Sequence, residues 1–384
     1  MLKKGVNLGS WLNPESYVLG GRNIPFCSFQ KEFKKSYGEE ELKYFCDNFR
    51  ENYITQKDFE IMSSWGAKII RLPIHFNFIE ETPYNYNQKN IDFLKKVFVW
   101  AQNYNLQIIL DLHASCGAQN RDWHSDSIGV ANLWEYDSNK ERTYRLWEFL
   151  VDTFKNDKSL YGYDILNEPV VENDEILLNF YEIIIDKISK IDVSHKIFFE
   201  GNMWGQKIDF LEKFFQKNHD KNVHVSIHTY APINFTYNFR KNYYYPGKID
   251  NENWNIEKIY EYLKPYSDFK KRNNIDLLVG EFGINPRNNA FGEINFLKDL
   301  LKVYEEYGFD WTYWTYKAVS NGTFPDGILQ YNENPSWIRR EGNIFGIENF
   351  YKEWATYKYE IIESWKTEKF EQNNFILEVL KLFF

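Results

Sequence analysis

Eight apolar runs alternate with amphipathic segments along this chain, and this alternation constrains the fold more than any other feature. Uninterrupted apolar runs are typical of strands that are buried on both faces of a parallel sheet. The predicted strands are Lys4–Leu12, Ala67–Phe76, Leu106–Ala114, Gly162–Glu168, Lys196–Asn202, His224–Tyr230, Asp276–Gly283 and Phe309–Lys317. Between them, residues such as Leu177, Tyr181, Ile184 and Ile188 recur at helical spacing, which predicts helices that pack on the sheet.

Eight strand-then-helix units favour an α/β fold, a closed (β/α)8 TIM barrel, over an open doubly wound sheet. The sequence has neither the G-x-G-x-x-G turn that open sheets often carry nor a Walker loop. No repeat, linker or low-complexity segment interrupts residues 1–384, so we expect a single domain. The apolar residues 375–384 are too few to span a bilayer and predict a C-terminal helical tail docked on the barrel.

Four long connections follow predicted strands. They are Asn13–Tyr53, Ser115–Glu141, Ala231–Trp254 and Ala318–Gly346. In a barrel these connections rise on the same C-terminal face, so they should wall a pocket above the strand ends.

Composition and charge limit the classes of partner and compartment. The formal net charge is -9 with acidic and basic residues mixed throughout, which argues against nucleic acid or an anionic membrane surface as partner. Aromatic residues make up 19% of the chain, so some should be exposed or line a cleft. Met1–Leu8 lacks a signal-peptide cleavage site and is interpreted as the first strand, so we expect a cytoplasmic protein. Cys27, Cys46 and Cys116 are most simply free thiols, and a Cys27–Cys46 bridge is the alternative.

Polar residues gather where the predicted strands stop. Asn167 and Glu168 precede Pro169, which cannot donate to a sheet ladder and therefore lies at or beyond the end of the fourth strand. Near the ends of other strands stand Arg71, His113, His228, Tyr230 and Glu281. Each alone has a structural explanation, such as an ion pair, a satisfied core histidine or a packing tyrosine. Together, on one rim of a barrel, they indicate an active site.

The two glutamates would face each other across the barrel mouth. Such a pair suits glycoside hydrolysis, retaining if the carboxylates are about 5–5.5 Å apart and inverting if they are about 6.5–9.5 Å apart. The sequence leaves that distance open. An arginine favours the ionised form of one carboxylate, and a less solvated site favours the neutral form of the other. Arg71 is the available arginine, so Glu281 is the better nucleophile candidate if the two touch.

Metal and serine chemistry are less well supported. His113, Cys116 and His124 lie close in sequence, but their spacing matches no familiar ligand set, so we expect neither a metal nor another cofactor. A G-x-S-x-G nucleophile elbow is absent from the sequence.

Five segments that occur in order carry a resemblance to a known family. They are Gly5–Leu12, Tyr53–Phe59, Arg71–Ile74, Asp111–His113 leading to Gln119-Asn120, and Trp314–Lys317. Over nearly its whole length the chain resembles glycoside hydrolase family 5, in the branch of exo-β-1,3-glucanases and bacterial β-glucosidases. The resemblance implies a retaining mechanism with Glu168 as general acid/base and Glu281 as nucleophile. It further implies that Asn167 binds the sugar 2-hydroxyl and that Arg71 and Tyr230 hold the nucleophile.

The resemblance also assigns residues around the sugar. His228 would stand beside the acid/base, His113 would bind a sugar hydroxyl, and Trp314 would be the stacking floor, since an aromatic face suits the C–H surface of a pyranose. Two departures from the branch occur. Ser10 stands where a second glycine is usual, and Asn13-Pro14-Glu15 replaces a more apolar continuation. Glu15 is nevertheless a candidate for binding the hydroxyls of a terminal sugar.

We therefore predict a retaining glycoside hydrolase that cleaves β-glucosidic bonds in β-glucans or β-gluco-oligosaccharides, exo-acting with β-1,3 preference. The nearer alternative is an endo-β-1,4-glucanase or mannanase with an open groove. An alternative of another class is a barrel that binds carbohydrate without cleaving it. Hydrolysis of phosphorylated glucosides would fit a cytoplasmic protein, but the sequence shows no obvious Lys/Arg/Ser cradle for a phosphate. The oligomeric state stays open.

Overall fold

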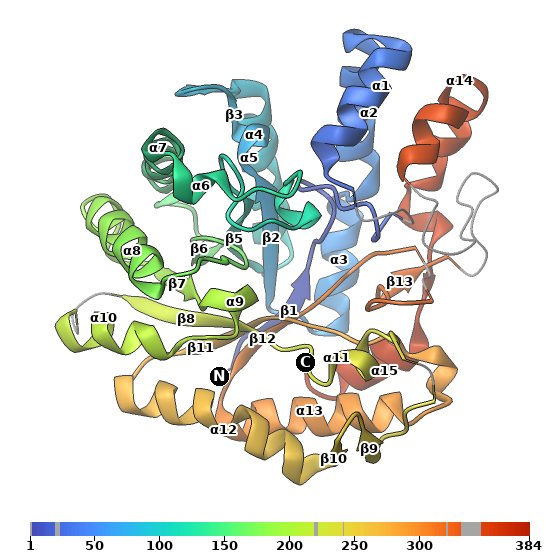
Figure 1. Ribbon diagram of the computed structural model, residues 1–384. Helices are drawn as coiled ribbons and strands as arrows, with labels where there is room; N and C mark the ends of the chain where they lie inside the picture. The colour runs from blue at the N-terminus through green and yellow to red at the C-terminus, as the bar shows by residue number, and fades with distance from the viewer. Residues whose placement is uncertain (1, 20–23, 219–221, 241, 320–321, 332–346) are drawn as a thin grey trace.

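Eight parallel strands close into a barrel in chain order (Figure 1). The computed structural model describes residues 2–19, 24–218, 222–240, 242–319, 322–331 and 347–384. The barrel strands are β1 (Lys4–Asn7), β2 (Ile69–His75), β5 (Gln107–Ala114), β6 (Leu160–Asp164), β7 (Lys196–Glu200), β8 (Val223–His228), β11 (Leu277–Phe282) and β12 (Asp310–Tyr313). The barrel closes where Lys4 of β1 pairs with Trp311 of β12. The predicted α/β TIM barrel is confirmed.

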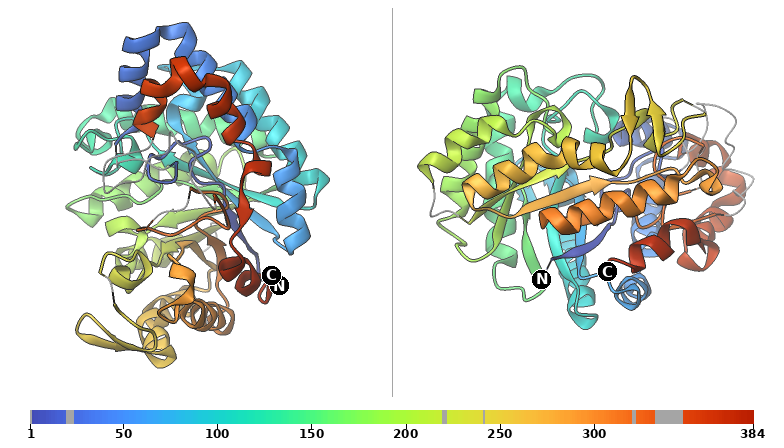
Figure 2. Two further views of the ribbon diagram at one scale, coloured as in Figure 1. Left: turned by 90° about the vertical axis from the view of Figure 1, so that its right-hand side faces the viewer. Right: turned by 90° about the horizontal axis from the view of Figure 1, so that it is seen from below.

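Helices surround the barrel on its outside (Figures 1 and 2). The longer ones are α1 (Phe26–Tyr37), α2 (Glu39–Tyr53), α3 (Gln56–Trp65), α5 (Gln88–Asn103), α7 (Asp137–Phe154), α8 (Asp174–Ile188), α12 (Ile256–Asn273), α13 (Glu293–Tyr307), α14 (Ile347–Ser364) and α15 (Asn374–Lys381). The predicted stripe of Leu177, Tyr181, Ile184 and Ile188 lies on α8 and is fully buried. Burial of this stripe against the strands fixes the helix on the sheet.

Shorter elements lie outside the barrel strands and the longer helices. The short helices and turns are α4 (Phe76–Ile79), η1 (Trp123–Ser125), α6 (Asn132–Glu135), α9 (Asn202–Gly205), η2 (Asp209–Leu211), α10 (Glu212–Lys217), α11 (Ile233–Thr236), η3 (Arg287–Asn289) and η5 (Thr367–Lys369). The two-stranded pairs are β3 (Glu80–Thr82) with β4 (Asn85–Tyr86), β9 (Gly247–Ile249) with β10 (Glu252–Trp254), and β13 (Leu329–Gln330) with β14 (Glu371–Gln372). The predicted connection 318–346 is described in part, because residues 320–321 and 332–346 lie outside the described residues.

Several predicted strands extend too far at their carboxyl ends. The fourth strand was predicted to reach Glu168, but β6 ends at Asp164. Beyond it the backbone keeps single contacts with neighbouring strands, as when Asn167 N–H donates to the carbonyl of Leu112 at 3.1 Å. An apolar run does not show where the hydrogen bonding between strands stops, so residues that follow the end of each strand were included in the predicted strand.

The C-terminal tail packs against the base of the barrel, as predicted. Ile376, Leu377 and Leu380 of α15 are buried, and the ring of Phe384 stacks on Trp311 of β12 at 5.3 Å. The two termini therefore lie side by side (Figure 2). The three cysteines are free thiols, which confirms the simpler prediction over a Cys27–Cys46 bridge. Among the described helices, none combines the length and apolar character needed to cross a bilayer.

A buried lysine connects the last barrel strand to the C-terminal segment. Lys317 is 1% exposed, and its Nζ donates to the carbonyls of Tyr53 and Trp365 at 2.5 and 2.7 Å. Burial lowers the pKa of the Lys317 ammonium to about 7, although the charges of Asp58 and Glu368 oppose that shift. Lys317, which follows β12, thus connects to Tyr53 and to Trp365 through an amine whose charge depends on pH.

Lys317→Met should reduce the increase of stability with pH. The pKa of Lys317 is about 7 in the folded protein against an ordinary 10.5, so the unfolded chain binds the extra proton between these values. The free energy of unfolding of the wild type therefore rises with pH in that window, by up to about 1.4 kcal/mol per pH unit from this group. Urea unfolding of both proteins from about pH 7 to 10 checks this. A constant difference between the two curves would contradict it.

Candidate active site

A cavity of about 610 Å³ opens where the barrel strands end. Its lining includes seven of the nine predicted site residues, namely Glu15, His113, Glu168, His228, Tyr230, Glu281 and Trp314. The other two, Arg71 and Asn167, are buried behind this lining. The structure thus brings the predicted residues together, and the long connections supply the walls through Tyr17, Trp123 and Phe324.

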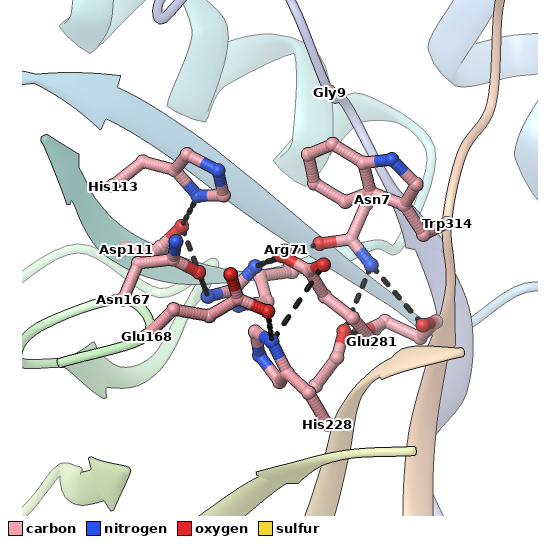
Figure 3. A network of polar contacts seen from close by, with 12 residues as sticks. Asn7, Gly9, Arg71, Asp111, His113, Asn167, Glu168, His228, Glu281 and Trp314 are labelled. Atoms are coloured by element: carbon pink, nitrogen blue, oxygen red, sulfur yellow. Dashed lines mark hydrogen bonds and ion pairs between the residues drawn. The ribbon is translucent and has the colours of Figure 1, made fainter. Parts of the chain in front are cut away.

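Arg71 is the centre of the polar network (Figure 3). It is fully buried, and its guanidinium contacts one carboxylate from each of four other strands. These contacts are Nε to Asp164 Oδ2 at 2.8 Å, Nη2 to Asp111 Oδ2 at 3.1 Å, Nη2 to Glu200 Oε1 at 3.0 Å and Nη1 to Glu281 Oε1 at 2.9 Å. Nη2 also donates to Asn167 Oδ1 at 2.8 Å. A planar guanidinium with five donors is the side chain that can satisfy so many acceptors at once.

The predicted position of Arg71 at the end of its strand is wrong. It is the third residue of β2, which continues to His75. Arg71 pairs in register with Asn7, the last residue of β1. Because strands of a barrel are staggered, a residue inside one strand lies level with the end of the next.

A shift of register in β11 sets the direction of the Glu281 side chain. The pairing of β11 with β8 shifts register between Val279 and Glu281, and Gly280 is the residue in between. A Cβ at Gly280 would lie 2.5 Å from Ser226 Oγ, so a larger residue here would displace the Ser226 side chain. The bulge turns Glu281 inward, where Oε1 accepts from Arg71 and Oε2 accepts from the Tyr230 hydroxyl at 2.9 Å. These are the two contacts that the resemblance implied.

Glu168 follows β6 in a left-handed backbone conformation, with φ of 47°. For a residue with a side chain such a conformation costs about 1–3 kcal/mol, so its surroundings must hold it. Its N–H donates to Glu200 Oε2 at 2.7 Å, and its carbonyl accepts from Asn120 Nδ2 at 2.9 Å. Two histidines contact the carboxylate: His228 Nδ1 lies 2.8 Å from Oε1 and His124 Nε2 lies 3.1 Å from Oε2.

A general acid is expected to be neutral before it donates its proton, but the charges around Glu168 favour the ionised carboxylate. Burial raises the pKa of the Glu168 carboxyl, but hydrogen bonds and charges from His124 and His228 bring that pKa below its ordinary value. Glu168 is thus ionised in the free protein, because two imidazolium groups offset the cost of burial.

A second carboxylate behind His228 supports it. Glu200 Oε1 lies 3.2 Å from His228 Nε2. Burial raises the pKa of Glu200 to about 7, and the charge of Asp164 adds to the increase while His228 and Arg71 oppose it. Burial lowers the pKa of His228, yet the charges of Glu200 and Glu281 raise it well above its ordinary value. His228 is therefore a cation between carboxylates.

His113, Glu15 and Trp314 form one end of the cavity. His113 Nδ1 lies 2.7 Å from Asp111 Oδ2, and its Nε2 lies 3.3 Å from Glu15 Oε1. The Trp314 indole stacks on the His113 ring at 5.4 Å with 9° between the planes, and its Nε1 donates to the Tyr17 hydroxyl. A carboxylate, an imidazole and an aromatic face thus meet beside the two glutamates.

The departure at Ser10 has a structural explanation. Ser10 has φ of 60°, a conformation that favours glycine, which is why glycine is the expected residue there. Its hydroxyl accepts from Glu15 N–H at 3.0 Å and lies 3.2 Å from the carbonyl of Glu15. The serine thereby compensates for its backbone conformation by fixing Glu15 at the cavity.

The residues weighed as metal ligands do not converge. His113 and His124 face Glu15 and Glu168 respectively, while Cys116 Sγ contacts Asn139 Oδ1 at 3.4 Å. A tighter acidic group, Asp111, Asp164 and Glu200, has carboxylate oxygens within 4.8 Å of one another. The guanidinium of Arg71 lies among these oxygens and supplies the cation that they need.

Sequence reasoning missed part of the network. Asp111, Asp164 and Glu200 were counted as strand residues without a role, and His124 was weighed only as a metal ligand. One signal was available: Asp111 and His113 are two residues apart in a strand, so they share a face. The charges on that face of a buried strand require a partner.

Comparison with known proteins identifies the family. Residues 31–320 match the family model described as cellulase, glycosyl hydrolase family 5. The chain belongs to glycosyl hydrolase family 5. It is a glycoside hydrolase.

Individual relatives carry different activities in their names. A β-xylosidase of Phanerodontia chrysosporium is 27% identical over 83% of this chain and 68% of its own length. Glucan 1,3-β-glucosidase 2 of Saccharomyces cerevisiae is 29% identical over 47% of this chain and 38% of its own length. The solved endoglucanase Cel5A of Thermotoga maritima has a TM-score of 0.65 at 19% identity, covering 98% of this chain and 96% of its own, and shows the shared fold.

Arg71→Met should lower the free energy of unfolding by about 3–5 kcal/mol, because it leaves buried carboxylates without their cation. Urea unfolding at neutral pH measures the loss. Arg145→Met is the matched control, since Arg145 also contacts two carboxylates, Glu141 and Glu148, but its side chain is 54% exposed. The control should change stability by less than about 1 kcal/mol. Equal losses in the two variants would contradict the central role of Arg71.

Proposed function

We propose that this family 5 enzyme is a retaining, exo-acting β-glucosidase that removes glucose from β-gluco-oligosaccharides with a preference for β-1,3 bonds. One observation carries the retaining mechanism. A carboxylate oxygen of Glu168 and one of Glu281 lie within 4.8 Å of each other. Retaining enzymes hold the pair about 5–5.5 Å apart, whereas inverting enzymes need about 6.5–9.5 Å to admit a water.

In the first step Glu281 attacks the anomeric carbon while Glu168 gives its proton to the glycosidic oxygen, so the leaving sugar departs as an alcohol. Arg71 and Tyr230 hold the Glu281 carboxylate in place for this attack. In the second step Glu168, now a carboxylate, removes a proton from water, and the hydroxide displaces Glu281 from the sugar. An ionised Glu168 in the free protein suits this second step.

We propose that Asn167 binds the sugar 2-hydroxyl. Its Oδ1 accepts from Arg71 Nη2 at 2.8 Å, which fixes the orientation of the amide. Its Nδ2 is buried and makes no hydrogen bond among the described residues. A buried donor without a partner favours an acceptor on the ligand, because leaving it unpaired costs about 1–3 kcal/mol.

Contacts between the walls favour exo action. The ring of Tyr17, in the connection 13–53, packs against the ring of Trp123 in the connection 115–141, with 5.1 Å between centroids. It also packs against the ring of Phe324 in the connection 318–346, at 4.8 Å. The ring of Phe324 also packs against that of Tyr237, in the connection 231–254, with 5.3 Å between centroids. The walls are therefore joined across the end that holds Glu15, which favours a pocket for a terminal sugar. The relatives named β-xylosidase and glucan 1,3-β-glucosidase agree with this choice.

Two alternatives have less support. An endo-β-1,4-glucanase is the second candidate, because the similar fold of Cel5A belongs to a protein named endoglucanase. Phosphorylated glucosides fit poorly, since the described residues that line the cavity include neither lysine nor arginine. A barrel that only binds carbohydrate would not need both glutamates with their supporting side chains.

Substitution of the two glutamates should separate their roles. Glu281→Gln should lower hydrolysis of an aryl β-glucoside by more than about 10⁴-fold, since the nucleophile is lost. Glu168→Ala should lower it by about 10²–10⁴-fold and be rescued by azide, which needs no general base. Initial rates measure both. Glu80→Gln, a buried glutamate paired with Arg142 outside the cavity, is the control and should stay within a few-fold of wild type. Activity of either site variant at the wild-type level would refute the assignment.

Exo action predicts a single sugar as the first product. Laminari-, cello- and gentio-oligosaccharides should each release glucose from the first turnover, with the laminari series fastest. Chromatographic sizing at low conversion checks this, and an aryl β-xyloside tests the sugar preference. Release of disaccharides or longer products first would support the endo alternative instead.

A further inference from the structure

The contacts of Glu168 with two histidines have no part in the two steps above. Its Oε1 faces His228 Nδ1 at 2.8 Å, and its Oε2 faces His124 Nε2 at 3.1 Å. Each oxygen lies against an imidazole nitrogen, and an ionised Glu168 has to gain a proton before it can donate to a glycosidic oxygen. If Glu168 is the acid/base, as proposed above and on which this inference rests, a neighbouring group must supply that proton.

His124 is the histidine better placed to give up that proton. His228 is 1% exposed and lies between Glu168 and Glu200. The side chain of His124 is 13% exposed and belongs to the short turn η1. Both histidines line the cavity, and His124 is the more exposed of the two.

A third side chain gives His124 a second partner. Asn120 Nδ2 lies 2.9 Å from the same Nε2. The orientation of that amide is fixed, because Asn120 Oδ1 accepts from Asp122 N–H and from Ser125 Oγ, both at 2.8 Å. Nδ2 is thus a donor. A protonated Nε2 donates to Glu168, whereas a bare Nε2 accepts from Asn120, and one nitrogen cannot do both.

We propose that His124 is a positioning residue that shares one proton with Glu168, and that Asn120 takes over Nε2 when the proton moves. With the proton on Nε2, the imidazolium donates to an ionised Glu168. With the proton on Oε2, Glu168 is the neutral acid, its O–H can turn to the glycosidic oxygen, and the bare Nε2 accepts from Asn120. One N–H bond breaks, one O–H bond forms, and the total charge of the pair is unchanged.

The surrounding charges favour storage of the proton on His124 in the free protein. Burial lowers the pKa of His124, but Glu168 and Glu15 raise it above its ordinary value, with His113 opposing them. On the other side, Glu168 faces His228, whose proton is held by two further carboxylates, Glu200 and Glu281. The hydroxyls of Tyr230 and Tyr237 lie in the same field and stay protonated, since burial raises the pKa of each. His124 therefore carries the proton that can be given up.

The test is the pH profile of kcat/KM on a phenyl β-glucoside, whose poor leaving group needs the acid. In the wild type, the alkaline limit reports loss of the shared proton, which His124 retains to higher pH than a carboxyl alone would. His124→Ala and His124→Gln should each move this limit to lower pH by about one to two units, since the ordinary pKa values of histidine and glutamate differ by about two. His75→Ala is the control, because His75 pairs with Asp126 of the same connection at 3.0 Å and should leave the limit in place.

Each outcome of this test either supports or contradicts the proposal. An unmoved limit in both variants contradicts the proposal, because a histidine that only supports the turn or binds sugar changes the rate and not the limit. A limit moved to higher pH also contradicts it, because the imidazolium would then only oppose protonation of Glu168. Thermal unfolding shows that each variant is folded. Full activity of Glu168→Ala is a separate result, which overturns the acid/base role itself.

Discussion

The buried guanidinium of Arg71 is the interaction on which the rest of the site depends. Four acidic side chains from β5, β6, β7 and β11 point into one barrel, where their mutual repulsion would be severe in a medium of low polarity. One planar cation from β2 contacts all four and also fixes the amide of Asn167. The strands can therefore close with their charges inside, and the position of that cation determines where Glu281, the proposed nucleophile, lies.

A division of charge follows from this arrangement. Glu281 lies on the arginine side, where its carboxylate accepts hydrogen bonds from Arg71 and Tyr230. Glu168 lies on the histidine side, where both partners can gain or lose a proton. Two glutamates within 4.8 Å thus have different chemistry because their neighbours differ, one with a fixed charge and the other with movable protons.

Much of this could be predicted from the sequence, and the failures have physical causes. The eight apolar runs gave the barrel, and the polar residues at their ends gave the two glutamates, because residues after parallel strands converge on one rim. Arg71 was misplaced since stagger between strands is invisible in one chain. Glu200 and Asp164 were missed because a buried charge resembles a surface charge until its partner is known. The role of His124 depends on a contact between residues 44 positions apart, His124 and Glu168, which no local pattern encodes.

The most direct measurement of the central claim is covalent trapping with a 2-deoxy-2-fluoro-β-glucosyl fluoride. The fluorine slows both steps, and the reactive leaving group lets the first proceed, so a retaining enzyme accumulates its glycosyl-enzyme intermediate. We expect one added sugar per chain by intact-mass analysis and, after digestion, an ester on Glu281. A label on Glu168, or an enzyme that turns over natural substrate yet never accumulates a label, would contradict this expectation.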